Sequence, residues 1–95
     1  MKILIMKIDL RANWVHSLKE KRMVVKSIIK KIQNTFNVSV SEVENQDLHH
    51  RITIGISKID LNNSNCNSSM ESIINFIEEN TDAEIIEIED EIINY

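Results

Sequence analysis

The sequence predicts an α+β domain in which two helices cover one face of a four-stranded antiparallel sheet. Three observations support this prediction. Segments with alternating apolar residues and segments with helical period follow one another in the order strand, helix, strand, strand, helix, strand. Each expected helix has one apolar stripe, and each expected strand has one apolar face. All of these apolar surfaces are buried together when both helices lie on the same side of the sheet.

Length and composition are consistent with one domain over residues 1–95, with one modest core. The chain is 42% hydrophobic and 27% charged, which is typical of globular proteins. The single cysteine, Cys66, has no partner for an internal disulfide. No segment reaches the ~20 apolar residues that a membrane span requires. We therefore expect a cytoplasmic protein that does not associate with membranes.

A strand and a helix are expected in the first part of the chain. Residues 3–10 alternate between apolar side chains on one face and mixed side chains on the other. A helix is expected over residues 18–34, because Ser17 and Glu20 have the spacing of a capping box, in which each side chain binds a backbone amide of the first turn. The predicted buried stripe of this helix comprises Leu18, Val25, Ile28, Ile29 and Ile32.

A hairpin is expected after this helix. Its strands cover residues 37–44 and 51–57, and a polar loop joins them. Val43 is out of phase with the apolar face of its strand, which indicates a bulge or the strand's end. Gly55 lies inside the second strand, where glycine marks a bulge or the close approach of a neighbouring group. The sequence leaves both alternatives open.

The last part of the chain repeats the order of helix and strand. Residues 62–67 are expected to form a polar linker, and Ser68 with Glu71 repeats the capping-box spacing at the start of the second helix. Asn80 is expected to cap the end of that helix. The last strand is expected at residues 84–89. Crossovers that skip one position then give the strand order 4-1-3-2, which is the ferredoxin-like arrangement.

Several short motifs are spread along the chain between His16 and Gly55. They are His16-Ser-Leu-Lys-Glu-Lys-Arg22, Val25-Lys26-Ser27, Phe36-Asn-Val-Ser-Val40, Glu42-Val43, Gln46-Asp-Leu48 and Gly55. Together they resemble the YlxP-like family of bacterial proteins, a domain of unknown function. The resemblance implies a ferredoxin-like fold, a cytoplasmic bacterial protein and a role near the ribosome, because members are often encoded beside translation initiation and ribosome-maturation factors. It supplies no catalytic residue. The chain departs from the family at His49, where an aromatic residue often stands.

Positive charge gathers on one side of the first expected helix. At about 100° per residue, Lys19, Arg22, Lys26 and Lys30 fall within roughly 80° of one another. We call these four residues the basic stripe; Lys21 and Lys31 are expected to flank it. No acidic residue lies on the stripe, although the net charge of the chain is −4. We expect the stripe to contact the phosphates of a polyanion such as RNA. The alternative is an ordinary solvated helix face.

Charge is also divided along the chain. Residues 1–58 contain all 11 Lys and Arg with five acids, whereas residues 59–95 contain ten acids and no Lys or Arg. This division predicts a strong dipolar field around the folded molecule.

The sheet face without helices, called the open face below, is expected to present polar side chains and no aromatic one. Its predicted members are Lys7, Asp9, Arg51, Thr53, Gly55 and Ser57. Base stacking on the sheet, which RNA-recognition motifs use, is therefore not expected. The open face is also expected to hold an apolar patch suited to a protein contact, formed by Ile3, Ile5 and Ile85. Trp14 is either an interface anchor or a cover for the end of the core.

No catalytic or metal-binding arrangement is evident. His16, His49, His50 and Asp47 do not have the spacing of a zinc site, and the side chains of the adjacent His49 and His50 would diverge in a strand. We expect no enzyme, no metal and no cofactor. The function expected first is that of an accessory protein that binds RNA or a ribosomal subunit through the basic stripe. The alternative is a protein-interaction or homodimerisation module that uses the open face.

Overall fold

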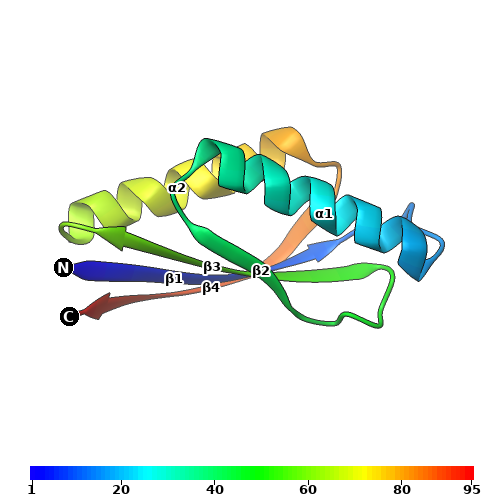
Figure 1. Ribbon diagram of the computed structural model, residues 1–95, viewed down its shortest axis with the longest axis horizontal. Coiled ribbons are helices and arrows are strands. Elements are labelled where there is room, and N and C mark those ends of the chain that lie inside the picture. Colours follow the sequence, from blue (N-terminus) through cyan, green and yellow to red (C-terminus); the bar gives the residue numbers. More distant parts are fainter.

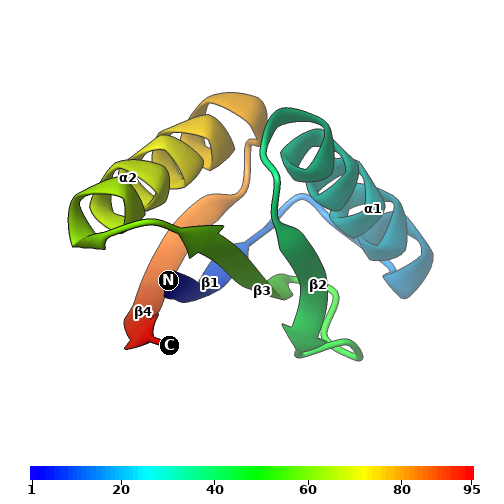
Figure 2. The same cartoon turned by 60° about the vertical axis from the view of Figure 1, so that its left-hand side comes forward.

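The computed structural model describes the whole chain from Met1 to Tyr95. Its elements are β1 (Lys2–Arg11), α1 (Leu18–Thr35), β2 (Ser39–Glu44), β3 (Arg51–Asp60), α2 (Asn63–Asn80) and β4 (Glu84–Asn94). The strands form one antiparallel sheet in the order β2-β3-β1-β4, and both helices lie on one face of it (Figures 1 and 2). The predicted ferredoxin-like fold and strand order are confirmed. No helix is both long enough and apolar enough to cross a membrane.

The core lies between the helices and the sheet. The two central strands supply its largest part, namely Leu4, Met6, Ile8, Leu10, Ile52, Ile54 and Ile56. α1 adds Val25, Ile28 and Ile32, and α2 adds Cys66, Ile73 and Ile77. Leu18 and Ile29, which were also predicted to be buried, are only half-buried. Ile29 lies at the margin of the apolar stripe, on the flank of α1 that faces β2.

The start of α1 is the predicted one. The Glu20 amide donates to Ser17 Oγ over 3.1 Å, so Ser17 caps the helix. In a standard capping box the Glu20 carboxylate would accept from the Ser17 amide. Here it accepts instead from the amide of the preceding residue, His16, over 3.1 Å. This arrangement satisfies two amides that have no partner within the helix.

The predicted start of α2 is wrong. The cap is Asn62, six residues before Ser68, and its side chain accepts from the Asn65 amide over 2.8 Å. The expected linker is therefore the first part of the helix, despite its run of residues with weak helix propensity. Burial explains the difference, because Cys66 in this segment is fully buried in the core. The other end also shifts by one residue: Thr81 is the C-cap, and Asn80 donates instead to the Phe76 carbonyl.

Two bulges set the register of the sheet. On β2 the pairing shifts between Glu42 and Glu44, so Val43 is the extra residue that its phase indicated. The Val43 side chain lies over Gly55: a Cβ atom at Gly55 would be 2.8 Å from Val43 Cγ1. Gly55 is therefore the residue that makes room for the bulge. The second bulge lies where β4 pairs with the end of β1, between Asp9 and Leu10.

Candidate functional site

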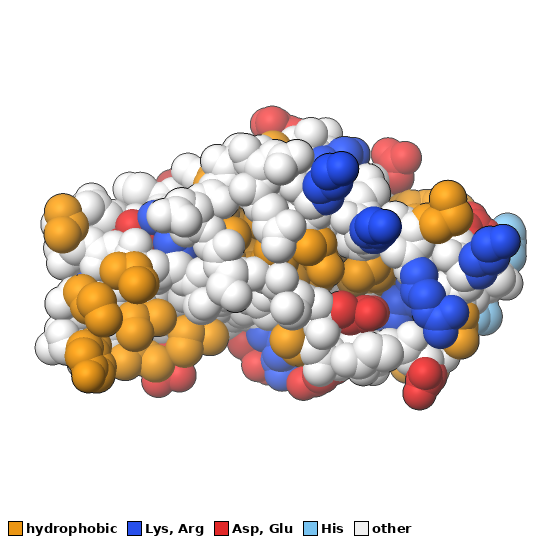
Figure 3. Space-filling view, viewed as in Figure 1, with side chains coloured by type: hydrophobic (Ala, Val, Ile, Leu, Met, Phe, Trp, Pro, Cys, Tyr) orange, Lys and Arg blue, Asp and Glu red, His pale blue; other side chains and the backbone are white.

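The basic stripe lies on the flank of α1 that faces β2. All four of its members, Lys19, Arg22, Lys26 and Lys30, are exposed. The space-filling view shows cationic side chains along this helix (Figure 3). None of the four takes part in any of the five ion pairs of the structure. The positive charge of the stripe is therefore free to act on a ligand.

A groove runs between the stripe and the outer strand β2. Its volume is about 570 Å³, and three stripe residues line it, Arg22, Lys26 and Lys30. Val25, which is buried, and Ile29, which is half-buried, form its apolar floor. The rest of the lining comes from Gln33, Asn34 and Glu42. We call it the α1–β2 groove. It joins cationic and apolar surface in one concave site.

Lys21 is not part of this cationic surface, although the sequence places it beside the stripe. It is 1% exposed and lies on the buried face of α1 with Val25, Ile28 and Ile32. Its Nζ is 2.9 Å from Glu42 Oε2 and also donates to the Asn45 carbonyl oxygen. A buried ammonium group requires such partners, because burial without them costs several kcal/mol. The pair fixes α1 to the β2–β3 hairpin.

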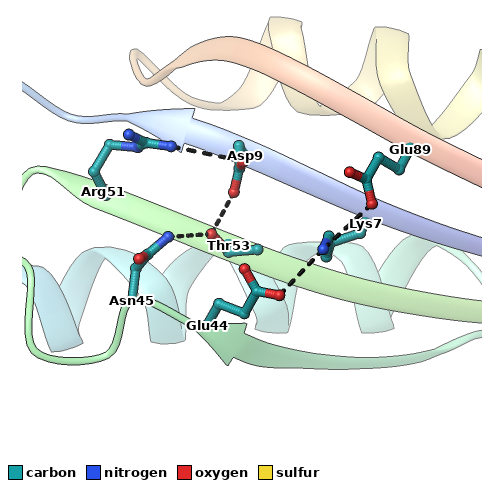
Figure 4. A network of polar contacts seen from close by, with 7 residues as sticks. All are labelled: Lys7, Asp9, Glu44, Asn45, Arg51, Thr53 and Glu89. Carbon is teal, nitrogen blue, oxygen red and sulfur yellow. Dashed lines mark hydrogen bonds and ion pairs between the residues drawn. The ribbon is translucent and has the colours of Figure 1, made fainter.

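A network of polar contacts continues from this hairpin onto the open face (Figure 4). Asn45 has a positive φ of 60°, a conformation that asparagine tolerates, and its side-chain amide donates to Thr53 Oγ1 over 2.8 Å. The Thr53 hydroxyl donates in turn to Asp9, and Arg51 pairs with Asp9 at 3.6 Å. Thr53 is on the open face, as predicted, but it is fully buried within this network.

Lys7 occupies the middle of the open face and is also paired. Its ammonium lies 3.1 Å from Glu44 and 3.3 Å from Glu89, on the two outer strands (Figure 4). The hydrogen bonds to Glu44 and then to Glu89 raise the pKa of Lys7 above its ordinary value. Arg51, at the start of β3, is also paired, so both of these open-face cations are engaged by carboxylates, unlike those of the basic stripe.

The apolar patch of the open face differs from the predicted one. Ile85 pairs with Leu10 and packs against the core, because the bulge near Leu10 reverses the alternation of β4. Ile3 on β1 instead has two isoleucine neighbours on this face. They are Ile93 on β4 and Ile59 on β3. We call Ile3, Ile5, Ile59 and Ile93 the isoleucine patch; Figure 3 shows apolar side chains gathered at the end of the sheet near both termini.

Two members of the isoleucine patch were missed in the sequence. Ile59 has the same phase as Ser57 and Gly55, and continuing that alternation to the end of β3 would have placed it on the open face. Ile93 lies beyond the predicted last strand, which ended at residue 89, and the regular alternation of β4 continues to it. Ile59 is 64% exposed, so it is the most accessible part of the patch.

Trp14 lies in the connection between β1 and α1 and is exposed. Its side chain is 41% exposed and lines a shallow hollow with Met23 on α1 and Asp82 after α2. Met23 is also largely exposed. The exposed surface of Trp14 is therefore available for contact.

Two of the three histidines, His49 and His50, form a contacting pair, and none belongs to a metal-binding group. His49 and His50 pack edge to face with ring centres 4.2 Å apart, because they lie in the hairpin loop and not in a strand, where they were predicted to diverge. No three side chains of His, Cys, Asp or Glu come together as metal ligands would. Cys66 is buried in α2.

The chain matches a known family and a curated bacterial protein. The family model described as "Protein of unknown function (DUF503)" matches residues 3–90. The chain is also 39% identical over 62 residues to the uncharacterized protein YlxP of Bacillus subtilis (strain 168), an alignment that covers 65% of this chain and 67% of that protein. The resemblance to the YlxP-like family is confirmed. Neither description assigns an activity.

Proposed function

We propose that this chain, which belongs to the DUF503 family of proteins of unknown function, is a cytoplasmic, non-enzymatic accessory protein that binds RNA, free or in a ribosomal subunit, through its basic stripe. The main support is that the four stripe residues are exposed on one flank of α1 and that none is paired with a carboxylate. Unpaired cations favour phosphate contacts, because a paired cation would first have to leave its partner.

The distribution of charge over the whole molecule favours the same surface. α1 contains six cations and one acid, whereas α2 and β4 together contain eight acids and no cation. Figure 2 shows α1 and β2 on one side of the molecule and α2 and β4 on the other. A polyanion is attracted to the α1 side and repelled from the other, which orients the molecule during encounter.

Salt dependence and charge reversal test this proposal. The affinity of the wild type for RNA should fall as salt is raised, and replacing Lys19, Arg22, Lys26 and Lys30 by Glu should abolish binding. Fluorescence anisotropy of a labelled RNA measures both, and circular dichroism shows whether the variant stays folded. Two single variants locate the site: Lys26→Glu should weaken binding, whereas Lys31→Glu, which makes the same charge change on another flank of α1, should have less effect.

Two results would contradict the proposal. One is a wild type that shows no salt-dependent binding to RNA or to ribosomal subunits. The other is a folded quadruple variant that binds as well as the wild type. In either case the basic stripe is a solvated helix face.

A second candidate function is self-association through the open face. The observation that favours it is the isoleucine patch, in which Ile59, Ile3 and Ile93 lie side by side across three strands. Contiguous exposed apolar surface of this kind is typical of a protein contact. Mass measured by light scattering should then rise with protein concentration, and Ile59→Glu should abolish that rise. A mass that stays at one chain across the range would exclude this candidate.

A further inference from the structure

The α1–β2 groove has features that contact with phosphates alone does not need. Its floor is apolar, formed by Val25 and Ile29. The side chains of Gln33 and Asn34, in the last turns of α1, line it and make no hydrogen bond within the protein. We infer that this groove receives an unpaired base of single-stranded RNA. This inference rests on the proposed function and names the form of RNA that is bound.

The spacing of the cations suits one strand that lies along the helix. Arg22, Lys26 and Lys30 follow one another at intervals of four residues, so their Cα atoms are about 6 Å apart along the helix axis. All three line the groove on its α1 side. A single strand can therefore bring successive phosphates to these cations while a base turns toward the apolar floor.

The chemistry of the lining suits a base. An unpaired base has an apolar face and a polar edge, and proteins that bind single-stranded RNA contact both. Val25 and Ile29 offer apolar contact for the face, and the amides of Gln33 and Asn34 offer donors and acceptors for the edge. The one acidic lining residue, Glu42, does not oppose a phosphate strongly, because the Lys21 ammonium 2.9 Å away neutralises it.

A duplex cannot use these features. Its bases are paired and stacked inside the helix, so a duplex meets only the cations at the rim of the groove. The same protein surface is therefore expected to bind duplex RNA by charge alone, and a single strand by charge and by contact with the floor. The structure thus predicts a preference for single strands.

The test compares a single-stranded RNA oligonucleotide with the blunt duplex of the same sequence, by anisotropy at one salt concentration. The wild type should bind the single strand about tenfold more tightly, because contact with the aliphatic floor removes apolar surface from water. Ile29→Ser keeps every cation, and it should remove most of this preference while affinity for the duplex stays the same. The matched control is Met23→Ser, an exposed apolar residue of α1 outside the groove, which should keep the preference.

A second variant covers the case in which Ile29→Ser does not fold. Gln33→Ala with Asn34→Ala changes two exposed side chains, and it should weaken binding of the single strand at least threefold without changing that of the duplex. Equal affinity of the wild type for both RNA forms, or a preference that survives in the folded groove variants, would overturn the inference and leave the proposed function intact. Absence of salt-dependent RNA binding would overturn both. A peptide of alternating Glu and Ile that binds in an Ile29-dependent way, where RNA does not, would assign the groove to an acidic protein segment.

Discussion

At the scale of single residues, Lys21 and Arg22 show how neighbours in one motif take opposite roles. Arg22 is exposed and lines the α1–β2 groove, whereas Lys21 is buried and holds Glu42 and the Asn45 carbonyl. The difference comes from the helical period, which turns Lys21 toward the core face of α1. One side chain therefore contributes charge to the candidate site, and the other fixes the helix that carries that site.

Removing Glu42 should destabilise the protein strongly. Glu42→Ala leaves the Lys21 ammonium buried without a counter-charge, and we expect a loss of about 3 kcal/mol in the free energy of unfolding. Replacing both partners, as Lys21→Met with Glu42→Leu, should restore most of this loss, because no buried charge remains. Urea denaturation of both variants measures the effect. Equal losses in the single and the double variant would show that the ion pair is not what Glu42→Ala disrupts.

Gly55 and Val43 should be energetically coupled. A methyl group added by Gly55→Ala would collide with Val43 Cγ1, and overpacking of this kind costs about 1–3 kcal/mol. Val43→Ala removes the colliding atoms, so the double variant should be more stable than Gly55→Ala alone. A double-mutant cycle on unfolding free energies measures the coupling. Additive effects of the two changes would mean that Val43 moves aside without cost.

At the scale of elements, the two helices differ in how their starts are encoded. α1 begins where a local signal stands, at Ser17, whereas α2 begins at Asn62, in a segment that reads as a linker. Packing decides the second case, because the early turns of α2 bury Cys66. Burial of an apolar face commonly contributes more to a helix than the intrinsic preference of its residues.

Cap variants should separate the true helix starts from the false one. Ser17→Ala and Asn62→Ala should each cost about 0.5–2 kcal/mol, because each removes the acceptor of a first-turn amide. Ser68→Ala, inside α2 and exposed, should change stability by less than about 0.5 kcal/mol. Hydrogen exchange of the first-turn amides in each helix provides the measurement. Faster exchange of residues 69–71 in Ser68→Ala, with none in Asn62→Ala, would place the start of α2 at Ser68 after all.

At the scale of the whole molecule, one core joins the helical layer to the sheet. Positive and negative charges lie on opposite sides of the molecule. The acidic α2 and β4 lie opposite the basic α1, so the molecule has a charge dipole although its net charge is only −4. On the sheet between them, Lys7 and Arg51 are neutralised by carboxylates. Free positive charge is thus concentrated on one helix, where the groove lies.

Truncating core side chains tests the packing of the helices against the sheet. Ile28→Ala on α1 and Ile54→Ala on β3 should each cost about 2–5 kcal/mol, because each leaves a cavity between helix and sheet. This is a large fraction of the ~5–15 kcal/mol typical of such domains. Ile59→Ala, on the exposed patch, is the control and should cost much less. Chemical denaturation gives all three values, and an unchanged midpoint for Ile28→Ala or Ile54→Ala would contradict the packing described here.

The sequence by itself determined the order of the elements, the layers and the strand order, together with the cap at Ser17, an irregularity at Val43 and the family. These follow from local patterns: apolar periodicity, cap spacing and short motifs. It also placed Lys19, Arg22, Lys26 and Lys30 on one flank, because helical geometry relates residues that are close in the chain.

Only the tertiary structure decided what depends on distant partners. The bulge between β1 and β4 removed Ile85 from the open face, and the pairing of Lys21 with Glu42 removed a cation from the surface. The groove beside the stripe likewise exists only because β2 lies next to α1. The physical reason is common to all three: periodicity assigns a side chain to a face of its own element, but the neighbouring element decides whether that face is covered, paired or free.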